Sequence, residues 1–179
     1  MKILLTLFVL LFSSLVVADD ISDFQIDGIS IGDSLLDYFE KNEILNNRKN
    51  YYKNKTYTPV ELSYSLGTTY DRLQFDYKTN DKKFIISSLH GILITKDLEE
   101  CNRMQEKILR NIESILNNLT FYEDDSNLDV DPSGKYYMYY AYFENGDIIN
   151  ITCYDYSTKS GYLDHLSVSL KTKEYNEFL

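Results

Sequence analysis

The stretch 129–134, DVDPSG, has residue types and a spacing that suit the binding of a calcium ion. Side-chain oxygens stand at its first, third and fifth positions, on Asp129, Asp131 and Ser133, and a glycine follows. A calcium loop of the EF-hand kind begins in this way and is closed by a bidentate glutamate. Tyr140 stands where that glutamate belongs. Two interpretations stay open: a weak calcium loop, or a solvated acidic turn shaped by proline and glycine.

A dense group of tyrosines follows this stretch: Tyr136, Tyr137, Tyr139, Tyr140 and Tyr142. Because successive residues of a strand point to opposite faces, these tyrosines must lie on both faces of a strand. Exposed tyrosines offer apolar area and a hydroxyl group with little entropy to lose, which suits contact with sugars, peptides or proteins. We therefore treat the group as a candidate binding face. The alternative is ordinary strand filling in a chain that has no tryptophan.

The two histidines, His90 and His165, have no partner at a catalytic or metal-binding spacing. No His-x-His or His-x-x-x-His pair occurs. The 28 acidic residues offer too many carboxylate pairs for two of them to be assigned to glycoside hydrolysis. The sequence therefore indicates no catalytic residue, and each histidine is interpreted as a strand residue with an ordinary hydrogen bond.

One long amphipathic helix is predicted over Asp97 to Leu119. Asp97 can cap its first turn, and Glu100 follows at the spacing of a capping box. Apolar residues recur at steps of three and four, which places them on one face: Leu98, Cys101, Met104, Ile108, Ile112, Ile115 and Leu119. We expect this face to pack on a sheet.

Alternating apolar residues predict strands on both sides of that helix. A hairpin is expected from 73–77 and 84–94, and a meander from 136–143, 148–155 and 162–171, with Asn145-Gly146 as one turn. A short edge strand is expected at 24–26, a helix starting near Ser34, an acidic loop at 123–134 and a last helix after Thr172. The order after the first helix is ββαβββα. This is an α+β fold, with an antiparallel sheet of about five strands and helices on one face.

Residues 1–18 have the pattern of a secretory signal peptide. Lys2 is followed by an apolar run from Ile3 to Val17, and small residues precede Asp19. The run is shorter than the roughly twenty residues that cross a bilayer, although an uncleaved anchor is the alternative. We expect cleavage before Asp19, a single exported domain over 19–179, a periplasmic or secreted location, and no stable membrane insertion after cleavage.

The two cysteines, Cys101 and Cys153, are expected to form a disulfide bond, because an oxidising compartment favours pairing of an even number of cysteines. Cys101 lies on the apolar face of the predicted helix, and Cys153 alternates with Ile149 and Ile151 on a predicted strand. The bond would tie the helix to the sheet. Two buried free thiols are the alternative.

The net charge of −10 makes nucleic acid an unsuitable partner. The acidic residues are spread along the chain, so the surface repels phosphate backbones and anionic lipid headgroups. We therefore expect no nucleic-acid partner.

Three stretches carry a resemblance to other proteins: GISIGDSLLD at 28–37, KKFII at 82–86 and DHLSVSLKTKEY at 164–175. They resemble secreted proteins of AT-rich marine bacteria over most of the chain after the signal peptide. The resemblance implies a bacterial periplasm but no particular activity. More remotely, residues 32–34 are similar to the start of envelope modules of the SmpA/OmlA type, which have a helical pair and an antiparallel sheet. This chain lacks their lipid-attachment cysteine and adds a long central helix, so no function is carried over.

These observations predict a non-enzymatic module of the periplasm or the secreted fraction, which binds an unidentified ligand or an envelope protein. No cofactor is expected apart from the calcium ion considered above. The alternative is a small secreted hydrolase whose site is hidden among the acidic and hydroxyl residues. A third class is a purely structural partner of another envelope protein.

Overall fold

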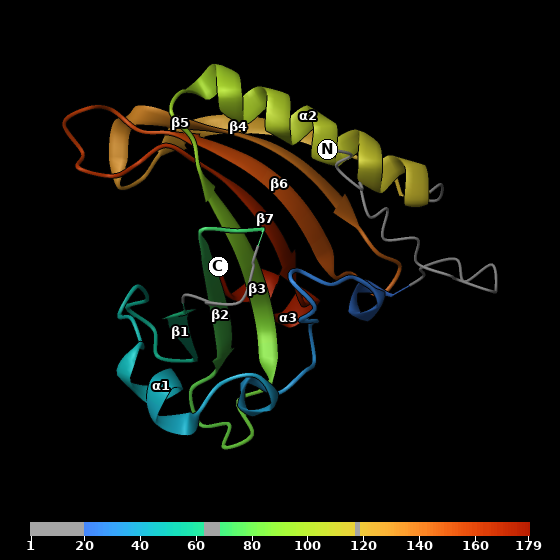
Figure 1. Ribbon diagram of the computed structural model, residues 1–179, viewed down its shortest axis with the longest axis vertical. Coiled ribbons are helices and arrows are strands. Elements are labelled where there is room, and N and C mark those ends of the chain that lie inside the picture. Colours follow the sequence, from blue (N-terminus) through green and yellow to red (C-terminus); the bar gives the residue numbers. More distant parts are fainter. Residues whose placement is uncertain (1–19, 63–68, 117–118) are drawn as a thin grey trace, which may run out of the picture.

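The computed structural model describes residues 20–62, 69–116 and 119–179, so the predicted signal peptide, 1–18, lies outside the described residues. The helices are α1 (Lys41–Asn46), α2 (Leu98–Ile115) and α3 (Lys173–Phe178). The strands are β1 (Tyr57–Leu62), β2 (Arg72–Lys78), β3 (Ile86–Ile94), β4 (Tyr122–Leu128), β5 (Asp131–Tyr142), β6 (Ile148–Asp155) and β7 (His165–Lys171). They form one twisted antiparallel sheet in the order β1-β2-β3-β7-β6-β5-β4 (Figure 1).

The α+β class and the antiparallel sheet are confirmed, but the sheet has seven strands where about five were expected. The two additional strands, β1 and β4, are its edges. β1 contains Pro59, which is tolerated at a sheet edge but obscures a strand pattern. β4 has an exposed acidic sequence without apolar alternation, because neither of its faces is covered over most of its length.

The predicted acidic loop at 123–134 is therefore wrong. Most of it is β4 and the start of β5, which are joined by a tight turn at 129–130. Charged side chains hid this hairpin from the sequence pattern, since edge strands commonly carry charges that prevent further pairing.

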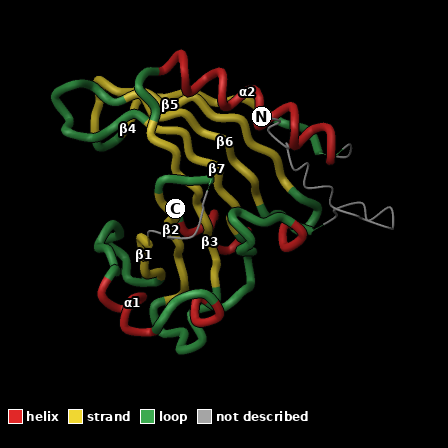
Figure 2. The backbone as a smooth tube through the Cα atoms, viewed as in Figure 1, coloured by secondary structure: helices red, strands yellow, loops and turns green. Residues whose placement is uncertain are grey.

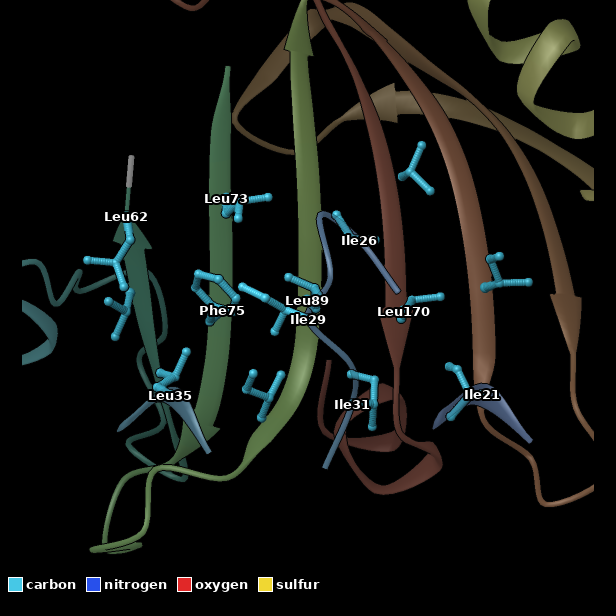
Figure 3. Close-up of a cluster of buried hydrophobic side chains, with 14 of the residues drawn as sticks. Ile21, Ile26, Ile29, Ile31, Leu35, Leu62, Leu73, Phe75, Leu89 and Leu170 are labelled. Atoms are coloured by element: carbon cyan, nitrogen blue, oxygen red, sulfur yellow. The ribbon is translucent and has the colours of Figure 1, made fainter. Parts of the chain in front are cut away.

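The N-terminal segment packs across one face of the sheet. A 3₁₀ turn at Ile21–Asp23 is followed by a bridge between Ile26 and Ile29, so the edge strand expected at 24–26 is wrong. The side chain of Ser34 caps a 3₁₀ turn at Leu35–Asp37, which replaces the start of the expected helix. Figure 3 shows the buried isoleucines of this segment lying over the strands. Burial of these side chains, more than local pairing, holds the segment in place.

Helix α2 covers the same face at the other end of the sheet, over β6 and β7 (Figures 1 and 2). Its predicted N-cap is confirmed, since the Glu100 amide donates to Asp97 Oδ1 at 2.8 Å. The predicted disulfide bond between Cys101 and Cys153 is also confirmed, with the two Cα atoms 5.8 Å apart. Four residues after Cys101, the buried Gln105 donates from Nε2 to the backbone carbonyls of Tyr137 and Ile151, both at 2.8 Å.

Helix α3 lies on the opposite face, so the expectation that helices cover one face holds for α2 and fails for α3. Thr172 caps α3 as predicted, by accepting from the amide of Tyr175. The ring of Tyr175 packs on Tyr57 of β1 and Phe178 of α3, and its hydroxyl group lies 2.5 Å from that of Tyr52. None of the helices in the described ranges is long and apolar enough to cross a membrane.

Candidate functional site

The sheet face opposite α2 is polar along its central strands. The residues that alternate with the apolar core there are Gln74, Asp76, Ser88, His90, Asn150, Thr152, Ser167, Ser169 and Lys171. The register places them in rows that cross β2, β3, β7 and β6; in one row, His90 stands between Gln74 and Ser169. An antiparallel sheet commonly carries polar side chains on the face away from its core, but most of the polar side chains of this face are buried, which is less common.

The most buried charged group of this face is Asp76, whose exposed fraction is 0%. The hydroxyl of Tyr52 donates to Asp76 Oδ1 at 3.0 Å, and the hydroxyl of Tyr175 lies next to that of Tyr52. Burial raises the pKa of Asp76 to about 6, although the hydrogen bonds from the tyrosines oppose this. Burial likewise lowers the pKa of Lys171 to about 8, against the attraction of Asp76. The carboxyl group is thus held by α3 and by the segment before β1.

His90 lies next to this carboxyl group on the same sheet face, and its side chain is largely buried. Its Nε2 lies 2.9 Å from Ser88 Oγ and 4.0 Å from Asp76 Oδ2, and its Nδ1 lies 3.5 Å from Ser167 Oγ. Burial lowers the pKa of His90 to about 3, helped by the charges of Lys171 and His165. His90 is therefore neutral at physiological pH and takes part in ordinary hydrogen bonds, as the sequence predicted for both histidines; His165 Nδ1 lies 2.9 Å from the carbonyl oxygen of Leu163.

The shifted pKa values of His90 and Asp76 predict how the stability of the protein changes in acid. The folded-state pKa of His90 lies below its unfolded value of 6.5, so the unfolded chain takes up the proton first as the pH falls. His90 thereby lowers the free energy of unfolding by about 2 kcal/mol as the pH falls from roughly 7.5 to 5. Asp76 acts in the opposite direction, because its raised pKa makes the folded state take up a proton first; it offsets about 1 kcal/mol over the same range.

We therefore expect the free energy of unfolding of His90→Gln to rise by about 2 kcal/mol relative to that of the unchanged protein when the pH is lowered over that range. Urea unfolding followed by circular dichroism at each pH measures the difference. Asp76→Asn should shift the other way and lose stability relative to the unchanged protein. A constant difference between His90→Gln and the unchanged protein at all pH values would contradict the prediction.

A pocket of about 500 Å³ opens on this polar face beside His90. We call it the tyrosine pocket. Its lining combines Tyr51, Tyr154, Tyr156, Tyr162 and His165 with Glu61, Arg72, Gln74, His90 and Ser167, and its rim includes Ile92, Ile94, Gly161 and Leu163. The polar floor comes from β2, β3 and β7, whereas the aromatic wall comes from the end of β6, the start of β7 and the loop between them.

The aromatic wall is a stack of nearly parallel rings. The rings of Tyr154 and His165 have centroids 4.7 Å apart at an interplanar angle of 24°, and Tyr154 and Tyr156 are 6.2 Å apart at 15°. Tyr162 adds a further ring, 5.1 Å from Tyr156. The Tyr156 amide donates to Asp164 Oδ1 at 2.7 Å, which fixes the loop that carries this wall. Of these rings, that of Tyr162 is exposed and can offer an aromatic face to a ligand.

The pocket exposes large apolar side chains to solvent. Tyr162 and Leu163 are each 57% exposed, and Tyr51 and Ile94 are also among the exposed large hydrophobic residues. Clusters of this kind mark interaction sites more often than single exposed residues do. A second hollow of about 360 Å³ lies between α2 and β4, but its charged lining is acidic: Glu106, Glu123, Asp124 and Asp125. The tyrosine pocket is therefore the better candidate site.

The structure divides the five tyrosines of the predicted binding face between the two faces of β5. Tyr137 packs against the core, and Tyr139 opposes Ile151 on the same side. The remaining three are on the face that also carries the pocket; Tyr140 contacts Tyr142 and Tyr122, and Tyr136 donates to Asp124 Oδ2 at 2.7 Å. None of the five lines the tyrosine pocket, although Tyr136 pairs in register with Tyr154 of its wall.

Apart from His90 and His165, the residues of the pocket do not stand out in the sequence. Tyr154 and Tyr156 alternate at the end of β6, which was the available signal, but it is weaker than the five tyrosines of β5. Arg72, Glu61 and Gln74 lie far from them in sequence, and Glu61 belongs to the edge strand that the pattern missed.

The three residues of the predicted calcium loop lie at the turn between β4 and β5. Asp131 is buried, and its carboxylate accepts from the Ser157 amide at 2.6 Å, the Ser157 hydroxyl at 3.0 Å and the Ser133 amide at 3.3 Å. These hydrogen bonds lower its pKa. Asp129 is exposed in the turn. No group of three or more metal-ligating side chains occurs within the described ranges. Asp131 thus fixes the loop after β6, and calcium binding stays a prediction.

Comparison with protein-family models, curated proteins and solved structures finds no significant match to this chain. Function is therefore inferred from the chemistry of the site.

Proposed function

We propose that this protein is an exported, non-enzymatic binding module, and that the tyrosine pocket holds a ring-shaped ligand of the sugar class. The single observation that supports this most strongly is the stack of Tyr154, Tyr156, His165 and Tyr162 beside a polar floor. The disulfide bond between Cys101 and Cys153 is compatible with an oxidising compartment such as the periplasm.

The two sides of the pocket match the two kinds of surface on a sugar ring. The flat C–H face of a pyranose packs on an aromatic ring and buries apolar area there. Its hydroxyl groups then reach the floor, where Gln74, His90 and Ser167 supply donors and acceptors. Pockets that combine apolar walls with a few fixed polar groups are the usual architecture of small-molecule sites. The tyrosines have little rotamer freedom to lose on binding, which favours affinity.

A hydrolase is the second candidate, because Ser167, His90 and Asp76 converge beside this pocket. Ser167 Oγ lies 3.5 Å from His90 Nδ1, and Asp76 Oδ2 lies 4.0 Å from His90 Nε2. In a Ser-His-Asp triad the serine contacts Nε2 and the aspartate contacts Nδ1, so the two nitrogens have exchanged partners here. Three features favour binding over catalysis. Asp76 is too distant for a hydrogen bond, the lowered pKa of His90 makes it a weak base, and Ser167 lies within paired strands, whose amides are used in the sheet.

A fluorophosphonate probe separates these two candidates. Covalent labelling of Ser167 that is lost in His90→Gln would favour the hydrolase. Absence of labelling, together with reversible binding of a sugar, supports the binding module.

The proposal predicts that Tyr162→Ala weakens ligand binding by about ten-fold, which corresponds to about 1.4 kcal/mol. The purified protein is titrated by calorimetry with oligosaccharides of several classes and with short peptides as a comparison set. Tyr142→Ala is the matched control, because Tyr142 is 50% exposed on the same sheet face but lies outside the pocket. It should leave the dissociation constant unchanged.

If Tyr162→Ala and Tyr142→Ala weakened ligand binding equally, the result would indicate that the ligand binds at the tyrosines of β5. Absence of binding to any member of the panel, combined with recovery of one envelope protein in a pull-down from periplasm, would support the structural-partner class instead.

A further inference from the structure

We propose that the ligand of the tyrosine pocket carries an oxyanion on its ring, and that Arg72 binds this group; the preferred class is an acidic sugar with a carboxylate. This inference rests on the proposed function and adds the charge of the ligand. The observation behind it is a guanidinium group that lines the pocket and has no ion pair or hydrogen bond to the described part of the chain.

Arg72 is an exposed residue at the start of β2, in register with Ile92 of β3. Its charge acts on three groups of the pocket, since it lowers the pKa of Glu61, Tyr51 and His165. Arg72 is therefore close to both the acidic edge of the pocket and the aromatic wall. A group bound by Arg72 would lie next to a ring that packs on that wall.

Glu61, a carboxylate in the lining of the pocket, already has partners of its own. Its Oε2 forms an ion pair with Lys49 Nζ at 3.1 Å, and its Oε1 accepts from the hydroxyl of Tyr51. Asp164, at the base of the aromatic wall, accepts from the Tyr156 amide. The neighbouring acids are thus engaged, and the charge of Arg72 is left available within the pocket.

A guanidinium group recognises a planar carboxylate through two parallel hydrogen bonds, and it binds phosphate in a similar way. The protein as a whole carries −10, so its surface repels anions. An exposed cation inside a pocket of such a protein selects for an anionic ligand group at that position. A ring that bears a carboxylate, such as a uronic acid, meets both the wall and Arg72. A sugar phosphate would provide the same charge from a different source.

Calorimetry with three matched probes tests this inference: a galacturonate oligomer, a neutral galactose oligomer of the same length, and galactose 6-phosphate. We expect the galacturonate oligomer to bind about ten-fold more tightly than the neutral oligomer. Arg72→Gln should remove this preference, so that the acidic and neutral oligomers bind with similar affinity. Arg103→Gln is the control, because Arg103 pairs with Glu99 on the surface of α2, away from the pocket.

The outcomes separate this inference from the proposed function. Equal binding of the acidic and neutral oligomers, both weakened by Tyr162→Ala, would overturn the role of Arg72 and retain the binding module. Tight binding of galactose 6-phosphate alone, lost in Arg72→Gln, would support the oxyanion site and replace the carboxylate by a phosphate. Failure of all three probes to bind would overturn the sugar class itself. The melting temperature of Arg72→Gln, compared with that of Arg103→Gln, shows whether the variant is folded.

Discussion

Replacement of both Cys101 and Cys153 by alanine is expected to lower the free energy of unfolding by about 3 to 4 kcal/mol. The bond closes a loop with a sequence separation of 52 residues and joins α2 to β6. In the chain-entropy description, its loss enlarges the ensemble of unfolded conformations. Both cysteines are also fully buried, so removal of the sulfur atoms leaves space in the core. Urea unfolding followed by circular dichroism measures the change.

Reduction of the unchanged protein with dithiothreitol is the control for this prediction. It opens the same loop while keeping both sulfur atoms, so the difference between the reduced protein and the double variant reports the packing contribution alone. Hydrogen exchange should increase first in α2, because this helix packs on the sheet mainly through its contacts with β6 and β7. A loss below about 1 kcal/mol in both samples would contradict the prediction, since this size of loop is expected to contribute more.

Tyr175→Ala is expected to destabilise the protein by about 3 to 5 kcal/mol, the usual range for removal of a large buried aromatic ring. Tyr175 is 1% exposed and is the buried residue of α3, the helix on the polar face of the sheet. Its ring lies 5.0 Å from that of Tyr57 and 6.1 Å from that of Phe178. The substitution also removes the hydroxyl group beside Tyr52, which bonds Asp76. Equilibrium unfolding in urea provides the measurement.

Tyr175→Phe is the matched variant for the hydroxyl group. It retains the ring and should cost only about 1 to 2 kcal/mol, the value of one hydrogen bond in a buried network. Both variants should also raise the hydrogen exchange of α3, and Tyr175→Ala should do so much more. If Tyr175→Ala and Tyr175→Phe were equally destabilised, the hydroxyl network and not the ring would hold α3 in place.

Sequence patterns predicted well the elements that are covered on one face. The hairpin of β2 and β3, helix α2 with its Asp97 cap, and the turn at Asn145-Gly146 all follow local rules of periodicity, capping and turn geometry. In the turn, Gly146 adopts a φ of +86°, which a residue with a side chain rarely does. These features depend on neighbours in the chain, and they are where prediction from one sequence is strongest.

The edges of the sheet and the N-terminal segment were predicted poorly for a common reason. β4 is exposed on both faces and shows no apolar alternation, and β1 carries a proline. The isoleucines of 21–31 pack across several strands, which has no periodic signature in the sequence. In each case the conformation depends on contacts with residues distant in the chain.

The candidate site was missed for the same physical reason. Arg72, His90, Tyr154 and Tyr162 come from different strands and loops, and only the register of β2, β3, β7 and β6 brings them to one pocket. The amino-acid sequence by itself determined the α+β class, the amphipathic helix and the pairing of Cys101 with Cys153, because periodicity and cysteine number are local or countable properties. The tertiary structure alone decided which tyrosines face solvent, which acid is buried and where a cation is left available, because those depend on packing across the sheet.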